Sequence, residues 1–402
     1  MKLDELLKKI QSVYNGIILD PNEIQKKSPN YIYRGFSVNE YCVPRREFHE
    51  IIDEIITTDK SFNLIARDSI CEKVYTKLIF QKRDQALFSS NDLEELISEF
   101  KSYKCQEYEV LMLFHGGLLD ADKPIQIGRF TWLNEHSHGD IIQSKYKMMS
   151  HYMASQNKNR QFISCKVEAR DVEKAKELAY IKFRKLDNIL KVFLQYKTPF
   201  HDLGVFGYKQ REHLPVCIYE KDNFKKGCSY SDGAGMYVCF ADFIKEHPAL
   251  EESISMMFCD TLPEMKKRIM LSLDFLGRAC SEKDMSIAFL LNMMAIEALI
   301  QYQENNYLSP SITNQIIEVY TFLLAHDYDK RIAINTHFHE LYRRRSAVAH
   351  GQNNIIDEVI FQTSKDYAFD LILNFLYDEK LKKINTIKEL KHLVQDLKFQ
   401  KP

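Results

Sequence analysis

The pattern of apolar and polar residues changes character along the chain. From about residue 249 to 400 apolar positions recur at helical spacing, while glycine occurs only at Gly277 and Gly351 and proline only at Pro263 and Pro310. Glycine and proline weaken helix interiors, so a long segment that nearly lacks both is typical of a helical bundle. We predict helices at about 264–279, 282–303, 311–326, 334–350, 356–377 and 385–398.

The second of these helices contains the longest apolar run of the chain, IAFLLNMMAIEALI at 287–300. It is apolar nearly all round, which places it in the middle of the bundle. Ser281 followed by Asp284 resembles a capping box, with Asp in the place of Glu, and predicts where the helix begins. The run is interrupted by Asn292 and Glu297 and is shorter than the roughly 18 apolar residues that a membrane span needs, so we expect no membrane association.

The first part of the chain mixes helix and strand signals. An amphipathic stretch predicts a helix at about 2–14, and a longer helix is expected at about 169–196, where Leu178, Ile181, Leu186, Ile189, Leu190 and Phe193 recur at helical spacing. Short apolar and aromatic runs, bounded by turn residues, predict strands at 73–81, 108–117, 126–133 and 159–169. We therefore expect an α+β protein, with a mixed domain over residues 1–245 followed by an all-α bundle over 246–402.

Composition narrows the class of protein. The 402 residues are 45% hydrophobic and 12% aromatic, enough to fill sizeable cores, and 55 Lys+Arg against 56 Asp+Glu leave a net charge of −1. That balance argues against a protein that coats nucleic acid non-specifically, but it leaves room for a local basic site. Nine cysteines lie singly without a CxxC pair, and the N-terminal stretch lacks the apolar core of a signal peptide. We expect a protein with reduced thiols in the cytoplasm.

One short stretch concentrates fixed positive charge beside a titratable group, YRRRSAVAHG at 342–351. It reads as the end of a helix that Gly351 stops. Arg343, Ser346 and His350 lie at i, i+3 and i+7 and share one face, while Arg345 lies on the adjoining face. A helix end of this kind presents guanidinium groups, a hydroxyl and an imidazole together.

These residue types suit the self-cleavage of RNA. Arginine is always charged and its planar fork fits phosphate oxygens, whereas histidine exchanges protons near neutral pH. Together they supply a base for the attack of the 2′-OH and a cation for the charge of the transition state, with no need of a metal. The same residues also fit a solvated helix face with a histidine favoured by the helix dipole, and the residue types alone leave both interpretations open.

The spacing of this stretch resembles a known family. Arg345-x4-His350, with Ser346 after the arginine and Gly351 after the histidine, is similar to the R-x4–6-H motif of HEPN domains. More particularly, LYRRRSAVAHG resembles the form found in the ApeA-like HEPN family, and the upstream FLLNMMAIEALIQY resembles an earlier helix of that family. The resemblance covers about residues 248–378.

The resemblance implies a metal-independent endoribonuclease without a cofactor, in which Arg345 and His350 are catalytic. It further implies that two protomers pair their motifs into one composite site that cuts tRNA or mRNA, as in toxins and in defence against phage. Ser346 departs from the family pattern, where many members carry Asn, Asp or His. Arg343 and Arg344 would add phosphate contacts, and Glu297 on the neighbouring helix would orient one of the arginines.

Two alternatives to a nuclease remain at this stage, and one further expectation concerns the N-terminal domain. The bundle could be a HEPN-like module that binds RNA, a nucleotide or a partner protein without cutting, which the departure at Ser346 keeps open. Alternatively, EHSHGD at 135–140 could hold a metal through His136 and His138 with Glu135 and Asp140, although we favour a polar loop after a strand. Finally, the N-terminal domain could sense a trigger that gates the bundle, through turns such as HGG at 115–117 or SDGAG at 231–235.

Overall fold

The computed structural model describes residues 3–18, 31–36, 39–119, 121–145, 160–195, 203–206, 217–220, 223–227, 238–302, 312–325, 327–351 and 356–399. The protein is mixed α+β, with helices predominating and small sheets, in agreement with the predicted class. Its chain forms two compact units, Met1–Val110 with Lys166–Tyr180, and Leu111–Cys165 with Ile181–Pro402. The expected division near residue 245 stays a prediction.

The first unit is built mainly from helices around one apolar core. Its elements are α1 (Leu3–Asn15), β1 (Tyr31–Phe36), β2 (Asn39–Pro44), α3 (Arg45–Thr58), the 3₁₀ helix η1 (Lys60–Leu64), α4 (Arg67–Arg83) and α5 (Ser90–Ser102). The two strands pair antiparallel, with Phe36 opposite Asn39 next to the turn. Apolar faces of the helices meet in the core, where Ile10, Ile52, Val74 and Phe100 are fully buried.

The strand predicted at 73–81 is wrong, because these residues lie within α4. The buried residues of this helix come as adjacent pairs one turn apart, Ile70 with Cys71, Val74 with Tyr75, and Leu78 with Ile79. That spacing defines one face of a helix, but the pattern begins at Ile70 and so extends outside the nine residues that were predicted as a strand. Within the window, Val, Tyr, Thr, Ile and Phe favoured a strand.

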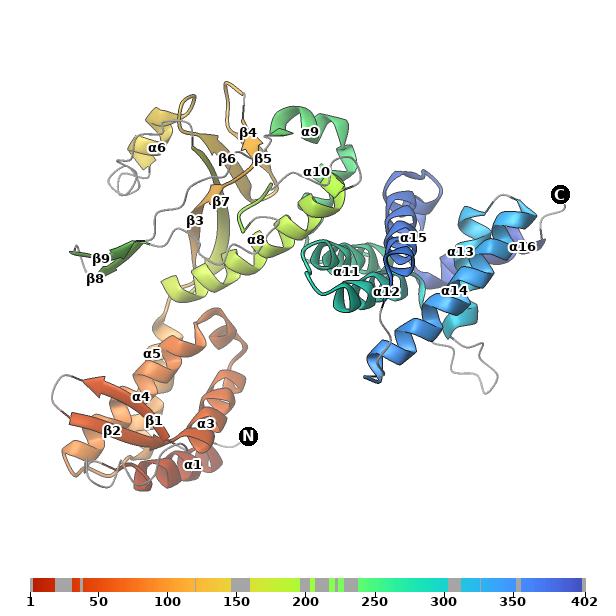
Figure 1. The fold of residues 1–402 in the computed structure, drawn as a ribbon. Helices are drawn as coiled ribbons and strands as arrows, with labels where there is room; N and C mark the ends of the chain where they lie inside the picture. The colour runs from red at the N-terminus through yellow and green to blue at the C-terminus, as the bar shows by residue number, and fades with distance from the viewer. Residues whose placement is uncertain are drawn as a thin grey trace. The chain divides into compact units, whose positions relative to one another are not determined.

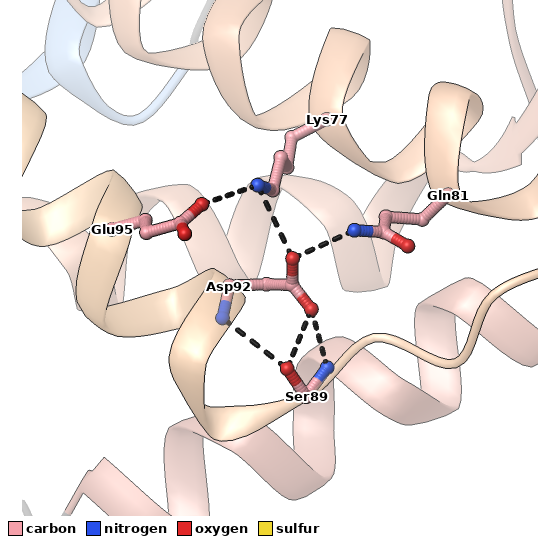
Figure 2. Close-up of polar contacts among 5 residues, drawn as sticks. All are labelled: Lys77, Gln81, Ser89, Asp92 and Glu95. Carbon is pink, nitrogen blue, oxygen red and sulfur yellow. Dashed lines mark hydrogen bonds and ion pairs between the residues drawn. The ribbon is translucent and has the colours of Figure 1, made fainter.

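A buried carboxylate joins α4 to the start of α5 (Figure 2). Asp92 Oδ2 accepts hydrogen bonds from the amide and the hydroxyl of Ser89, at 2.8 and 2.7 Å, and Ser89 caps α5 in return. Asp92 Oδ1 accepts from Gln81 of α4 at 2.7 Å and lies 3.2 Å from the ammonium group of Lys77. Lys77 also contacts Glu95 at 2.7 Å. One capping box therefore also fastens two helices together.

We expect Asp92→Ala to lower the free energy of unfolding by about 2 kcal/mol at pH 7, because it removes one half of the capping box, leaves the amide of Gln81 without its acceptor and leaves Lys77 with Glu95 alone. Burial opposes ionisation of Asp92, but the hydrogen bonds from Ser89 and Lys77 outweigh it, so the net pKa is lowered. The carboxylate therefore stabilises the fold above the pKa of an unfolded aspartate, about 3.9, and this contribution is lost as the pH falls through the lower folded pKa.

The difference between wild type and Asp92→Ala, measured by urea unfolding of the full chain, should therefore shrink below about pH 4. Glu95→Gln is the matched control. Its side chain is 70% exposed, and we expect a change within about 0.5 kcal/mol. Equal effects of the two substitutions would show that Asp92 is no more than a surface charge.

The second unit contains a four-stranded sheet in the order β3-β7-β6-β5. These strands are β3 (Gln106–Phe114), β7 (Gln161–Ala169), β6 (Phe130–Asn134) and β5 (Ile125–Ile127). The division between the units falls within β3, β7 and α8 (Val172–Gln195). Neighbours β5–β6 and β6–β7 pair antiparallel, and Trp132 lies opposite both Ile125 and Ile163. The strands predicted at 108–117, 126–133 and 159–169 are confirmed, the second as two strands joined by a turn at Gly128.

Helices cover both faces of this sheet. Successive residues of a strand point to opposite faces, so Leu133 and Phe130 lie on different sides. On one side Leu133 packs with Phe162 and with Ile142 of α6 (Gly139–Lys145). On the other, Phe130 stacks on Phe183 of α8, with ring centroids 5.7 Å apart. Two shorter pairings complete the strands, β4 (Gly117–Leu118) parallel to β10 (Val238–Cys239), and β8 (Cys217–Glu220) antiparallel to β9 (Asn223–Gly227).

After β10 every described element is helical. The helices are α9 (Phe240–Glu246), α10 (Pro248–Met256), α11 (Glu264–Ala279), α12 (Met285–Ile300), α13 (Ile312–Leu324), α14 (Tyr328–Ala349), α15 (Glu358–Tyr377), the 3₁₀ helix η2 (Leu381–Lys383) and α16 (Ile387–Phe399). The six helices predicted from the sequence are confirmed within a few residues at most ends. As expected, α12 is central and packs against α11, α13, α14 and α15 (Figure 1). Within the described residues, no helix is both long and apolar enough to cross a membrane.

The start of α12 differs from the predicted capping box. Asp284 caps the helix itself, accepting hydrogen bonds from the amides of Ser286 and Ile287 at 2.8 and 3.1 Å. Ser281 instead accepts a hydrogen bond from Lys191 of α8 at 2.5 Å. The sequence pattern placed the cap one turn too early, because an aspartate can occupy either the first or the last position of such a box.

Helices α8 and α11 approach each other unusually closely. A methyl group on Gly277 of α11 would lie 2.3 Å from the backbone oxygen and 2.5 Å from the Cα of Asn188 in α8. The Asn188 amide also donates to Asp274 at 2.9 Å. The absence of a side chain at Gly277 therefore sets the distance between these two helices.

Candidate functional site

The arginine and histidine stretch forms the last turns of α14. Asp327 begins this helix by accepting a hydrogen bond from the amide of Lys330 at 2.7 Å. At the other end the amide of His350 donates to the carbonyl of Ser346, and that of Gly351 to Val348, both at 3.1 Å. Gly351 has a φ of +68°, a conformation that glycine adopts without strain. The prediction that Gly351 ends the helix is confirmed.

The buried face of α14 determines which side chains reach solvent. Ile334, Phe338, Leu341 and Ala347 are buried, and the ring of Phe338 lies 5.0 Å from that of Tyr320 in α13. Away from this face, Arg343, Ser346 and His350 are all exposed, as their shared helical face predicts. The imidazole of His350 is thus open to solvent at the end of a well-anchored helix.

Arg345 turns toward the neighbouring helix α12. Its guanidinium donates to Glu297 Oε2 at 3.2 Å. The carboxylate belongs to the last turn of a mostly apolar helix and its side chain is 14% exposed, against 38% for Arg345. The contact expected between Glu297 and one of the arginines is therefore present, and its partner is the arginine of the R-x4-H pattern. Such a half-shielded pair fixes a guanidinium more firmly than an exposed one does.

Arg343 and Arg344 share a different carboxylate. Glu340 accepts hydrogen bonds from Arg343 at 2.7 and 2.5 Å and from Arg344 at 2.8 Å. The hydrogen bonds from the two guanidinium groups hold the pKa of Glu340 down at about 2. Glu340 was not among the residues expected at the site, although its spacing to the two arginines, i+3 and i+4, is the spacing of helical ion pairs.

Within one chain, Arg345 and His350 do not lie on the same face of α14. Five residues correspond to about 140° around a regular helix, and Arg345 contacts α12 while His350 is exposed at the helix end. Each of the three guanidinium groups already contacts a carboxylate. An arginine has five donors, however, so Arg345 keeps others for a phosphate while Glu297 holds it.

Tyr342 is a further residue of this site that sequence reasoning missed as a functional candidate. It lies three positions before Arg345, and its hydroxyl oxygen is buried next to Glu297. Residues at i and i+3 share a helix face, so the spacing to Arg345 was the signal that could have found it.

The fragment EHSHGD does not form a strand with two histidines on one side. Residues 135–137 are a turn after β6, and α6 begins at Gly139, which confirms the interpretation as a polar loop. His138 is buried, and its Nδ1 accepts a hydrogen bond from the amide of Asn134 at 2.9 Å. Glu135 pairs instead with Arg160 at 3.6 Å. Over the described ranges, no group of three or more His, Cys, Asp or Glu side chains is arranged to hold a metal ion.

Of the two turns considered for a trigger, HGG at 115–117 joins β3 to β4, and Gly116 has a φ of +73°. The other, SDGAG at 231–235, lies outside the described residues. Gly116 adopts this conformation without strain, and its carbonyl accepts a hydrogen bond from the amide of Val238 at 2.9 Å.

We found no match for this chain among protein-family models, curated proteins or solved structures.

Proposed function

We propose that this protein is a metal-independent endoribonuclease of the HEPN type, similar to the ApeA-like family, with its catalytic part in the helical bundle of residues 246–402. The observation that carries the proposal is the ion pair between Arg345 and Glu297. This ion pair holds the arginine of the R-x4-H pattern. Its carboxylate comes from α12, which the resemblance to the family also covers, and His350 is exposed at the capped end of α14.

The proposed reaction needs only groups of the protein and the RNA. His350 takes the proton of a 2′-OH as its oxygen bonds to the adjacent phosphorus, the bond from phosphorus to the 5′ oxygen breaks, and that oxygen takes a proton from the imidazolium or from water as it leaves. Arg345 stabilises the charge that develops on the phosphoryl oxygens. The products are a 2′,3′-cyclic phosphate and a 5′-OH end. Ser346 and the remaining arginines position the phosphate.

We propose that a second copy of the chain completes this catalytic site. Arg345 and His350 of one protomer lie on different sides of α14, so a homodimer that sets two motifs face to face would supply both groups to one phosphate. We further propose a cytoplasmic role as a toxin or defence effector acting on tRNA or mRNA, with the residues ahead of the bundle, 1–245, gating it in response to a trigger.

A binding module without catalysis is the second candidate. It is favoured by the pairing of every guanidinium of the run with a carboxylate of the same chain, which reduces the free positive charge next to His350. Binding of RNA, nucleotide or partner that survives both Arg345→Ala and His350→Ala would support it.

The first experiment is incubation of the purified full chain with total tRNA and with mRNA in EDTA, resolved on a denaturing gel. The proposal expects fragments that carry cyclic phosphate ends, detected by their resistance to 3′ end ligation until the cyclic phosphate is opened and the resulting phosphate removed to leave a 3′-OH. Cleavage that appears only when Mg²⁺ or Zn²⁺ replaces EDTA would contradict a metal-independent mechanism.

The pairing of Glu340 with two arginines leads to a prediction about RNA binding. Glu340→Gln should free Arg343 and Arg344 for phosphate, so RNA should bind more tightly and the slope of log K against log salt should steepen by about 1 to 2. Binding is measured by fluorescence anisotropy at several salt concentrations, in a His350→Ala background that prevents cleavage.

Asp329→Asn is the control for that measurement, since it removes one negative charge from an exposed position on the first turn of the same helix. We expect it to change the slope little. An equal change in both variants would mean that the overall charge of α14, rather than release of the two arginines, controls binding.

A further inference from the structure

The residue Tyr342 occupies the same side of α14 as Arg345, facing α12. Its hydroxyl oxygen is buried, and among the described residues it makes no hydrogen bond of ordinary geometry. A buried hydroxyl is costly unless it can donate, and the acceptor next to it is the carboxylate of Glu297. Glu297 is therefore approached from α14 by two side chains one turn apart, the guanidinium of Arg345 and the phenol of Tyr342.

The charge state of the phenol fixes the direction of this contact. Burial raises the pKa of Tyr342 above its ordinary value of 10, and the nearby charge of Glu297 raises it further, while Arg345 acts in the opposite direction. The hydroxyl thus keeps its proton at neutral pH. Between a neutral phenol and a carboxylate, the phenol is the donor.

We propose that Tyr342 is a positioning residue, whose hydroxyl holds the Glu297 carboxylate in the orientation that fixes Arg345. The effect on cleavage rests on the proposed function, but the contact among the three side chains does not. One carboxylate oxygen contacts Arg345, at 3.2 Å, which is near the long end for a hydrogen bond between charged groups. A second donor to the same carboxylate removes its freedom to rotate, and a fixed carboxylate leaves the guanidinium one preferred direction.

The surroundings leave this task to Tyr342. Neighbouring buried positions on α14, Leu341 and Ala347, carry no polar group. Glu297 itself lies in a run of apolar residues of α12, so its own helix offers it no side-chain donor within one turn. The hydroxyl of Tyr342 is the polar group of α14 that faces Glu297 together with Arg345.

Tyr342→Phe tests the proposal, because it removes the hydroxyl and keeps the ring. In RNA cleavage by the full chain we expect kcat to fall about 10- to 100-fold with KM unchanged within about twofold, since a misplaced Arg345 weakens the transition state more than substrate binding. Tyr367→Phe is the matched control, as its phenol belongs to the same bundle and bonds to His337 at 2.6 Å. It should leave kcat unchanged.

A double-mutant cycle with Glu297→Ala provides a measurement that is independent of RNA, because alanine removes the acceptor of the phenol. If Tyr342 acts through Glu297, the Tm of the double variant should lie no lower than that of the more destabilised single variant. Additive losses in Tm would overturn the proposal, whatever the nuclease activity. If the wild type cleaves no RNA but the cycle is non-additive, the proposed nuclease function fails while the positioning contact stands.

Discussion

Replacing His350 with alanine should lower the rate of RNA cleavage in EDTA by at least about 100-fold, and toward 10⁴-fold if the imidazole serves as both base and acid. The residue is exposed at the end of α14 and takes part in no described core, so its loss should leave the Tm nearly unchanged. The measurement is the initial rate on one tRNA, together with thermal unfolding of the same preparations.

His339→Ala is the matched control for that substitution. His339 is also exposed and lies on the same helix, about three turns before His350. Its loss should leave the rate within about twofold, because the proposed chemistry involves only the helix end. Equal losses of activity in both variants would indicate that histidines of α14 act by general charge rather than by proton transfer.

The largest expected effect on stability comes from Gly277→Ala. In an exposed helix this change would stabilise by about 1 kcal/mol, but here the added methyl group meets the backbone of Asn188 at 2.3 and 2.5 Å. Backbone atoms of α8 cannot move aside as a flexible side chain would, so the two helices must separate. We expect a net loss of about 3 kcal/mol, at the upper end of the range for overpacking.

A loss of that size should lower the Tm of the full chain by roughly 5–10 °C. Gly139→Ala is the control, because nothing lies within 4 Å of a methyl group built at the start of α6. Its Tm should remain within about 2 °C of the wild type. If Gly277→Ala unfolds at the wild-type temperature, the close approach of α8 and α11 is not a feature of the folded protein.

The helical part of the fold was predictable because its signal is local. A near absence of glycine and proline, with apolar residues at helical spacing, suffices to place α11 through α16. The end of α14 was predictable for the same reason, since Gly351 follows the last helical residue. Local patterns also placed Arg343, Ser346 and His350 on one exposed face.

What the sequence could not provide depends on contacts between segments. The face of α4 became clear only over its full length, so a nine-residue window of it was taken for a strand. That Glu297 contacts Arg345 rather than another arginine depends on how α12 and α14 are rotated against each other. The approach of α8 to Gly277 joins residues about 90 positions apart, and no periodicity along the chain encodes such a contact.

The sequence indicated the ion pairs of Glu340, but another interpretation of the same arginines was preferred. Its spacing to Arg343 and Arg344 predicts helical ion pairs, yet the three consecutive arginines suggested phosphate contacts first. Pairing with Glu340 and contact with phosphate would use the same guanidinium groups. The salt dependence of Glu340→Gln decides between them.

The central claim is that this protein cleaves RNA by attack of the 2′-OH without a metal. The most direct measurement compares one tRNA sequence, unmodified and with every 2′-OH methylated, incubated with the wild-type protein in EDTA and resolved on a denaturing gel. Our account predicts that the unmodified RNA is cut and the methylated RNA stays intact, because the nucleophile has been blocked. Cleavage of both would show that water is the nucleophile and would contradict the mechanism assigned to Arg345 and His350.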